Sequence, residues 1–178
     1  MKDKLLQTYK TDRLTLAPVT IDDAPDMYEY ASVPDNAYYV FKTNETLAET
    51  KAIIERIFID NGLGRYGIFL GDKLIGTIYL LNLDDQNKTA ELSYVLNKKF
   101  EGNGYATEAA MKLREVFFFE LGGERLYARH TLDNIKSMNL MARIGMKVEG
   151  TLRNSYYFHN RQVDLVIWSI VRSDLDIG

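Results

Sequence analysis

The stretch that decides the fold lies past the middle of the chain and reads Glu101-Gly102-Asn103-Gly104-Tyr105-Ala106. An alternating strand is predicted over residues 90–96, and the strongest helical pattern of the chain follows over residues 104–121. Free N–H groups at a helix start bind anions, and the helix dipole adds about half a positive charge there. Gly102 and Gly104 let a phosphate approach without a Cβ in the way. The stretch predicts a phosphate-binding turn, although the glycines by themselves are equally typical of a turn that is merely tight.

Two better-known nucleotide motifs do not fit this turn. The dinucleotide fingerprint requires a third glycine at position 107, where the chain has Thr107. A Walker A loop ends in Gly-Lys-Ser/Thr, which is missing here. The sequence therefore excludes a Rossmann dinucleotide site and a P-loop at this position.

Outward from the turn, helical and strand patterns alternate along the chain. Helices are predicted at residues 20–31, 46–58, 104–121 and 133–145, the last capped by Asp133. Strands are predicted at residues 13–17, 66–70, 74–80, 90–96, 125–131, 147–158 and 162–171. This order predicts an α/β fold with a mixed sheet of about seven strands and about four helices packed on it.

Composition limits what the chain can do. With 178 residues, 46 % hydrophobic and 26 % charged, we expect a single domain over residues 1–178, with its core at about 11–173. The net charge of −3 and the lack of a basic run argue against nucleic-acid binding. No apolar run approaches the roughly 20 residues that span a bilayer, so we expect no membrane partner and a cytoplasmic protein. With no cysteine and two histidines, thiolate chemistry and a multi-histidine metal site are excluded, and we expect no metal.

The turn belongs to a longer series of matches. The chain resembles the GNAT superfamily of acyl-CoA-dependent N-acyltransferases, nearest to its RimJ/RimL-like branch, whose turn has the pattern Gln/Arg-x-x-Gly-x-Gly/Ala. Gly104 and Ala106 fit this pattern, whereas Glu101 stands where the family has Gln or Arg. Further matches in the same order are Thr11-Asp12-Arg13-Leu14, Asn134-Ile135-Lys136-Ser137, Gly145-Met146 and Glu149-Gly150-Thr151-Leu152-Arg153. The resemblance implies a GNAT-like fold with a mostly antiparallel central sheet.

The resemblance also implies a cosubstrate, acetyl-CoA, and a set of residues that bind it. The strand residues 93–96 would donate backbone hydrogen bonds to the pantetheine arm and the thioester carbonyl. Asn134 would bond the pantetheine amides, or it serves only as a local helix cap. The residues assigned to acetyl-CoA are Tyr94, Val95, Leu96, Glu101, Gly102, Asn103, Gly104, Tyr105, Ala106, Thr107, Asn134 and Ser137.

Two side chains are candidates for proton transfer. In similar N-terminal acetyltransferases a serine at the position of Ser137 contacts the sulfur and relays its proton, and the alternative is a plain helix serine. Many GNAT enzymes use a tyrosine four residues further along, but this chain has Met141. Glu91 is the candidate base, directly or through water, because a carboxylate in an apolar strand is costly unless paired or wet. Its alternative role is a salt bridge to an arginine of the neighbouring strand. His130 is interpreted as a histidine packed in its strand.

The acceptor is the least determined part. The resemblance places Tyr38, Tyr39 and Tyr156 in segments that border the acceptor pocket, although such aromatic residues are also typical of a core. We expect acetyl transfer to a primary amine, for which a protein or peptide N-terminus is one candidate. The alternatives are a small-molecule acetyltransferase for polyamines or antibiotics and a catalytically silent acyl-CoA-binding module. The sequence leaves the oligomeric state open, with a homodimer as one alternative.

Overall fold

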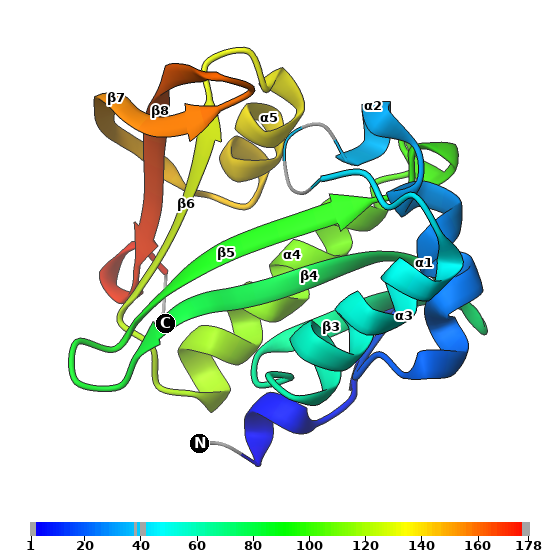
Figure 1. Cartoon of the computed structure of the whole chain (residues 1–178). Coiled ribbons are helices and arrows are strands. Elements are labelled where there is room, and N and C mark those ends of the chain that lie inside the picture. Colours follow the sequence, from blue (N-terminus) through cyan, green and yellow to red (C-terminus); the bar gives the residue numbers. More distant parts are fainter. Residues whose placement is uncertain (1–2, 38, 40–41, 176–178) are drawn as a thin grey trace. The chain divides into compact units, whose positions relative to one another are not determined.

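The computed structural model describes residues 3–37, 39 and 42–175. Within that part of the chain, eight strands form one sheet in the order β1-β2-β3-β4-β5-β6-β8-β7 (Figure 1). The strands are β1 Tyr9–Lys10, β2 Thr15–Ala17, β3 Arg65–Leu70, β4 Lys73–Asp84, β5 Thr89–Leu96, β6 Arg125–Thr131, β7 Lys147–Phe158 and β8 Arg161–Val171. The helices are α1 Ala24–Ala31, α2 Pro34–Ala37, α3 Leu47–Ile54, α4 Tyr105–Glu115 and α5 Ile135–Arg143.

The predicted fold class is confirmed. Pairing is antiparallel between β1 and β2, β2 and β3, β3 and β4, β6 and β8, and β7 and β8, whereas β5 and β6 run parallel. All seven predicted strands are present, and β1 is the eighth. The sequence did not predict β1 or α2, because two and four residues are too few to show a hydrophobic period. The helix predicted to continue through residue 121 changes after Glu115 into a π-helical turn, Val116–Glu120.

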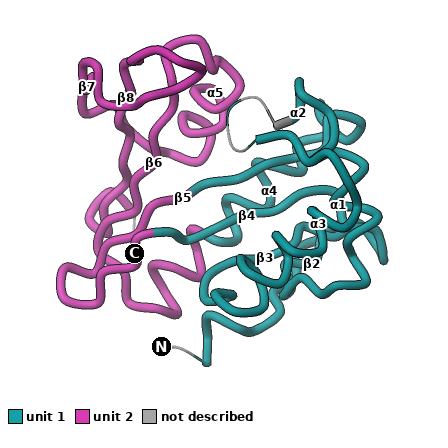
Figure 2. Tube along the Cα trace, in the orientation of Figure 1, with its two compact units in different colours: residues 1–81, 93–113 teal, residues 82–92, 114–178 magenta. Residues whose placement is uncertain are grey.

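The chain forms two compact units, residues 1–81 with 93–113 and residues 82–92 with 114–178 (Figure 2). The prediction of one domain over residues 1–178 stays a prediction. In the first unit α1 and α3 lie on one face of the strands and α4 lies on the other (Figure 1). The core on the α1 and α3 side consists of Val19, Ala24, Met27, Tyr30, Ala31, Ile54, Phe58, Leu74 and Val95.

Two local features position the elements around this core: the cap of α3 and a glycine in β4. Thr46 caps α3 as predicted, because its hydroxyl accepts a hydrogen bond from the Glu49 N–H at 3.1 Å. Gly76 lies in β4 where the end of β5 comes closest: a Cβ there would lie 2.4 Å from the carbonyl oxygen of Val95. Only glycine allows this approach, so Gly76 fixes the position of the strand end from which the phosphate turn begins.

In the second unit β6 pairs with β5 on one side and with β8 on the other. The β7–β8 hairpin closes through His159 and Asn160, whose φ angles are 46° and 61°. Positive φ at both central residues is the geometry of a type I′ turn, and its twist suits the twist of the two strands. The hairpin predicted around residues 159–161 is therefore confirmed.

Candidate functional site

The turn that the sequence predicts to bind phosphate lies in the first unit, directly before α4. Gly102 and Gly104 are exposed and have φ angles of 80° and 79°, in the region that favours glycine. The first bond of the helix joins the Glu108 N–H to the Gly104 carbonyl at 3.0 Å. The N–H groups of residues 105–107 precede that bond, so the helix itself provides no acceptor for them. These groups, together with the helix dipole, can bind an anion such as a pyrophosphate.

The chain enters this turn through a short 3-10 helix, Lys98–Phe100, which is held by Asn97. Asn97 is 2 % exposed, and its Oδ1 accepts a hydrogen bond from the Lys99 N–H at 3.0 Å. The N–H of Glu101 then donates to the Lys98 carbonyl at 3.2 Å. The residues before Gly102 are thus fixed by local hydrogen bonds.

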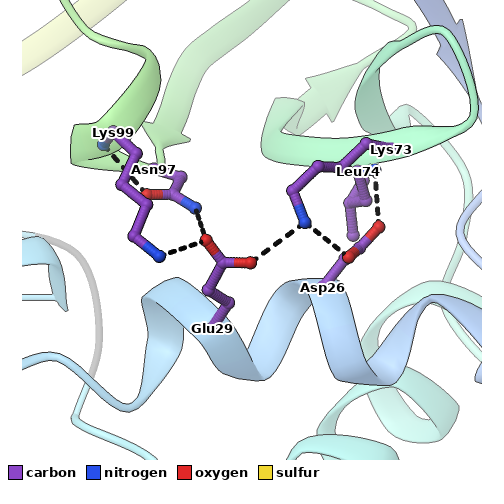
Figure 3. Close-up of polar contacts among 6 residues, drawn as sticks. All are labelled: Asp26, Glu29, Lys73, Leu74, Asn97 and Lys99. Carbon is purple, nitrogen blue, oxygen red and sulfur yellow. Dashed lines mark hydrogen bonds and ion pairs between the residues drawn. The ribbon is translucent and has the colours of Figure 1, made fainter.

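A network of charges on α1 supports the same entry segment (Figure 3). Glu29 accepts hydrogen bonds from Asn97 Nδ2 at 3.3 Å, Lys99 Nζ at 2.8 Å and Lys73 Nζ at 2.9 Å. Lys73 Nζ lies between the two carboxylates of α1 and also donates to Asp26 Oδ1 at 2.8 Å. The hydrogen bond from Lys99, followed by that from Lys73, lowers the pKa of Glu29 to about 2. The Glu29 network therefore keeps an ionised carboxylate against the start of the phosphate turn.

Asn36 of α2 holds the end of β5 and was not found from the sequence. Its Nδ2 donates to the Leu96 carbonyl at 2.7 Å, and its Oδ1 accepts from the Lys98 N–H at 3.0 Å. Asn36 and its partners are separated by about 60 residues of chain and belong to no shared motif. No local pattern could have indicated this contact, because it exists only after the chain folds.

At the start of α5, Asn134 and Ser137 lie together. Asn134 is the N-cap, and its Oδ1 accepts a hydrogen bond from the Ser137 N–H at 3.1 Å. The cap is therefore Asn134, and the prediction of Asp133 was wrong by one residue. Ser137 is half-buried on the first turn, whereas Met141, one turn later, is buried. The capping role weighed for Asn134 is present, and it leaves the Nδ2 amide group of the same side chain for other contacts.

Glu91 of β5 has the partner that was its alternative interpretation. Arg129 of the neighbouring strand β6 donates from Nε to Oε1 at 2.9 Å and from Nη2 to Oε2 at 2.8 Å. Asn82 Nδ2 adds a third hydrogen bond to Oε2 at 2.8 Å. The bond to Glu91 is the main cause that raises the pKa of Arg129. Glu91 is 8 % exposed, and the ion pair offsets part of the cost of burying its charge.

His130 is packed in the sheet, as predicted. Trp168 Nε1 can only donate, and it donates to His130 Nε2 at 2.9 Å. His130 Nδ1 therefore carries the proton and donates to the Thr131 carbonyl at 2.7 Å. With both ring nitrogens engaged and the side chain buried, His130 has a structural role.

The predicted acceptor residues are placed only in part. Tyr38 lies outside the described residues. Tyr39 is exposed, and Tyr156 on β7 is 47 % exposed and stacks on Phe158 with 5.9 Å between the ring centroids. Among residues 3–37, 39 and 42–175, no three His, Asp or Glu side chains gather as a metal-ligand cluster. Within the same residues, no helix has the length and apolar character needed to cross a bilayer.

Comparison with known proteins places this geometry in a family. The family pattern of the Acetyltransferase (GNAT) domain matches residues 13–147. The N-acetyltransferase YoaA of Bacillus subtilis (strain 168), itself uncharacterized, is 30 % identical over 92 % of this chain and 96 % of its own. The solved structure of the microcin C7 self-immunity acetyltransferase MccE, in complex with acetyl-CoA and AMP, superposes with a TM-score of 0.80 and is 26 % identical. It covers 90 % of this chain and 93 % of MccE.

Relatives with named acceptors differ from one another. A ribosomal-protein-serine acetyltransferase of Escherichia coli (strain K12) is 29 % identical over 57 % of this chain and 57 % of its own length. A spermidine N(1)-acetyltransferase of the same strain is 21 % identical over 70 % of this chain and 67 % of its own. The ribosomal-protein relative agrees with the RimJ/RimL-like resemblance of the sequence. The chain belongs to the GNAT family of N-acetyltransferases.

Proposed function

We propose that this acyltransferase binds acetyl-CoA through the turn 101–106 and transfers its acetyl group to a primary amine. The observation that carries the proposal is the turn itself, with two exposed left-handed glycines before the three leading N–H groups of α4. GNAT enzymes use acetyl-CoA, and MccE was solved with it bound. Both facts support CoA as the anion that this turn receives.

The strand end next to the turn would hold the pantetheine arm. The backbone of Tyr94, Val95 and Leu96 is proposed to bond the arm, and Asn36 keeps the Leu96 carbonyl in one orientation. Asn134 uses its Oδ1 for the helix cap, so its Nδ2 is the group proposed to bond a pantetheine carbonyl. When bound, acetyl-CoA supplies the activated acyl group as a thioester.

Ser137 is proposed to donate a proton to the leaving thiolate. Its backbone N–H is held by the Asn134 cap, which fixes the backbone from which the hydroxyl projects on the first turn of α5. A positioned general acid accelerates such a step by about 10²–10⁴-fold. Met141 has no proton to give, so the tyrosine version of this role is excluded at that position. Glu91 is not given the role of the base, because Arg129 and Asn82 already engage its carboxylate.

For the acceptor we propose a protein or peptide N-terminus. The RimJ/RimL-like matches of the sequence and the ribosomal-protein-serine relative support this choice. The spermidine relative supports a polyamine as the second candidate. Both acceptors are amines that must lose a proton before attack, so the chemistry does not separate them.

The test is the release of free thiol from acetyl-CoA by the full chain with defined acceptors. A panel of short peptides with free N-termini is compared with spermidine, an aminoglycoside, and the same peptides with a blocked N-terminus. Release with free but not blocked peptides is the expected result. Release with spermidine alone would contradict the peptide acceptor and indicate a small-molecule acetyltransferase. Binding of acetyl-CoA without release by any acceptor would indicate a silent module, and no binding at all would overturn the assignment of the turn.

A further inference from the structure

The segment between β1 and β2 folds into a tight turn of its own, Thr11–Leu14. The Thr11 N–H donates to the Leu14 carbonyl at 2.9 Å, and the Leu14 N–H donates to the Thr11 hydroxyl at 2.8 Å. This closure directs three donors to the same side: the Thr11 hydroxyl, the Arg13 N–H and the Arg13 guanidinium. They all meet one acceptor of the first unit, the carboxylate of Glu108.

Glu108 lies on the first turn of α4, immediately after the phosphate turn. It accepts from the Thr11 hydroxyl at 2.5 Å, from the Arg13 N–H at 3.0 Å and from Arg13 Nε at 2.7 Å. Burial, the largest single influence, raises the pKa of Glu108, but the bonds from Thr11 and Arg13 together bring it below its ordinary value. A bare carboxylate at a helix start would compete with a phosphate for the same positive potential. Arg13 compensates that charge.

Arg13 also reaches the phosphate turn directly. Its Nη1 donates to the Asn103 carbonyl at 3.0 Å, and its guanidinium carbon lies 4.6 Å from the centre of the Tyr105 ring. In a trans peptide the C=O and N–H groups point in opposite directions. Holding the Asn103 carbonyl toward Arg13 therefore turns the Gly104 N–H to the other side of the peptide, where it can face an anion.

The side chain of Asn103 likewise holds carbonyl groups of the preceding peptides. Its Nδ2 donates to the Phe100 carbonyl at 3.2 Å and to the Glu101 carbonyl at 3.1 Å. By the same geometry, the Gly102 N–H is directed away from the Glu101 carbonyl. The conformation of the turn is thus set by donors that occupy its carbonyl groups.

We infer that Arg13 is a positioning residue for CoA binding, which acts through Glu108 and the Asn103 carbonyl to hold the N–H groups of the turn toward the pyrophosphate. The inference rests on the proposed assignment of that turn to CoA. It gives a physical role to the Thr11–Leu14 motif, which lies about 90 residues from the turn in sequence. It also explains why arginine suits the position: separate nitrogens of its planar fork, Nε and Nη1, donate to Glu108 and to the Asn103 carbonyl.

The test measures CoA affinity by calorimetry, with pantetheine as a probe that has no pyrophosphate. Arg13→Gln should raise the Kd for CoA about tenfold, as expected for one lost hydrogen bond from a charged group, and leave the Kd for pantetheine unchanged. In the thiol assay the KM for acetyl-CoA should rise while kcat at saturation stays the same. The matched control is Arg65→Gln, which removes an arginine that also holds two carbonyl groups of the first unit, those of Ile57 and Asn61. That variant should keep wild-type CoA affinity.

Three further variants separate positioning from direct charge and guard against misfolding. Arg13→Gln should cost less CoA affinity in a Glu108→Gln background than in wild type, because the double variant Arg13→Gln/Glu108→Gln leaves no uncompensated carboxylate at the helix start. Arg13→Lys should recover only part of the affinity, because it keeps the charge and loses the fork. Full recovery by lysine, an unchanged Kd in Arg13→Gln, or an equal loss for pantetheine would overturn the inference. A wild-type chain that binds no CoA would instead overturn the proposed function.

Discussion

Arg129 donates two hydrogen bonds to the Glu91 carboxylate, from Nε to Oε1 at 2.9 Å and from Nη2 to Oε2 at 2.8 Å. The two partners are not equally buried: the side chain of Glu91 is 10 % exposed and that of Arg129 is 38 % exposed. Losing Arg129 and losing the charge of Glu91 should therefore lower the free energy of unfolding by different amounts. The same contact bears on what Glu91 can do in a reaction, because three donors already engage its carboxylate.

Removing Arg129 should destabilise the protein more than removing the charge of Glu91. Arg129→Met leaves a buried carboxylate without its cation, which costs on the order of 3 kcal/mol. Glu91→Gln leaves a guanidinium that water can reach, which costs about 1 kcal/mol. Urea denaturation gives the two free energies of unfolding. Equal losses, or the reverse order, would contradict the unequal burial of the two partners.

Glu91→Gln should also leave the shape of the pH–rate profile unchanged. If the ion pair is structural, kcat/KM keeps its acidic limb, and the rate falls only as far as the folded fraction does. A general base in this position would instead lose about 10²–10⁴-fold in rate together with that limb. The profile is measured with the acceptor that releases thiol fastest, and Arg129→Lys serves as a control that keeps the charge of the pair.

Ser137→Ala should lower kcat about 10²-fold or more, the range of general-acid catalysis, while the Kd for CoA changes less than about twofold. The hydroxyl is proposed to act on the leaving thiolate, whereas the turn supplies the binding energy. Thiol release gives kcat and calorimetry gives the Kd. Ser155→Ala is the control, because this exposed serine donates to a nearby carbonyl, that of Leu152, at 3.1 Å. An unchanged kcat in Ser137→Ala would dismiss the proton-relay role.

Glu101→Gln should tighten CoA binding several-fold at low salt. Glu101 stands where the family has Gln or Arg, and a carboxylate beside a pyrophosphate repels it by an amount that salt screens. The gain should shrink as ionic strength rises, which calorimetry in two salt concentrations can measure. If the affinity is the same in both proteins at both concentrations, the Glu101 carboxylate faces away from the phosphates.

Acid should weaken the Glu29 network. Its folded-state pKa of about 2 lies below the ordinary value of 4.5, chiefly because of Lys99 and then Lys73. The stabilisation is therefore complete above about pH 4.5 and is lost as the pH falls toward 2. Urea denaturation across this range should show a smaller acid loss for Glu29→Gln than for wild type. Glu149, whose pKa is also about 2 because of Arg125 and Ser169, keeps part of the acid sensitivity in that variant. Parallel curves for the two proteins would contradict the prediction.

The sequence by itself determined the secondary structure around the turn and suggested the class of ligand that is proposed for it. The sequence pattern located seven strands, including β6 and β7 with their observed bounds. Buried and more exposed residues alternate over most of β6, as a strand period requires, whereas β7 is exposed along almost its whole length and was located as the partner of β8 in the predicted hairpin. Gly102 and Gly104 predicted the turn before α4, since left-handed φ angles favour glycine. The helix caps show the limit of such signals. Thr46 caps α3 as predicted, whereas at α5 two residues that can cap, Asp133 and Asn134, adjoin, and the predicted cap was one residue too early.

Only the tertiary structure decided which side chains meet. The partner of Glu91 is 38 residues away, Asn36 meets Leu96 across 60 residues, and Arg13 meets Glu108 across 95. A single sequence contains no periodic signal for such pairs, because they form only when separate elements pack. The entropy lost in closing the long loops between them is offset by the packing of the whole fold. The sequence could therefore offer Glu91 as base or ion pair with equal reason. The position of Arg129 on the neighbouring strand favours the ion pair.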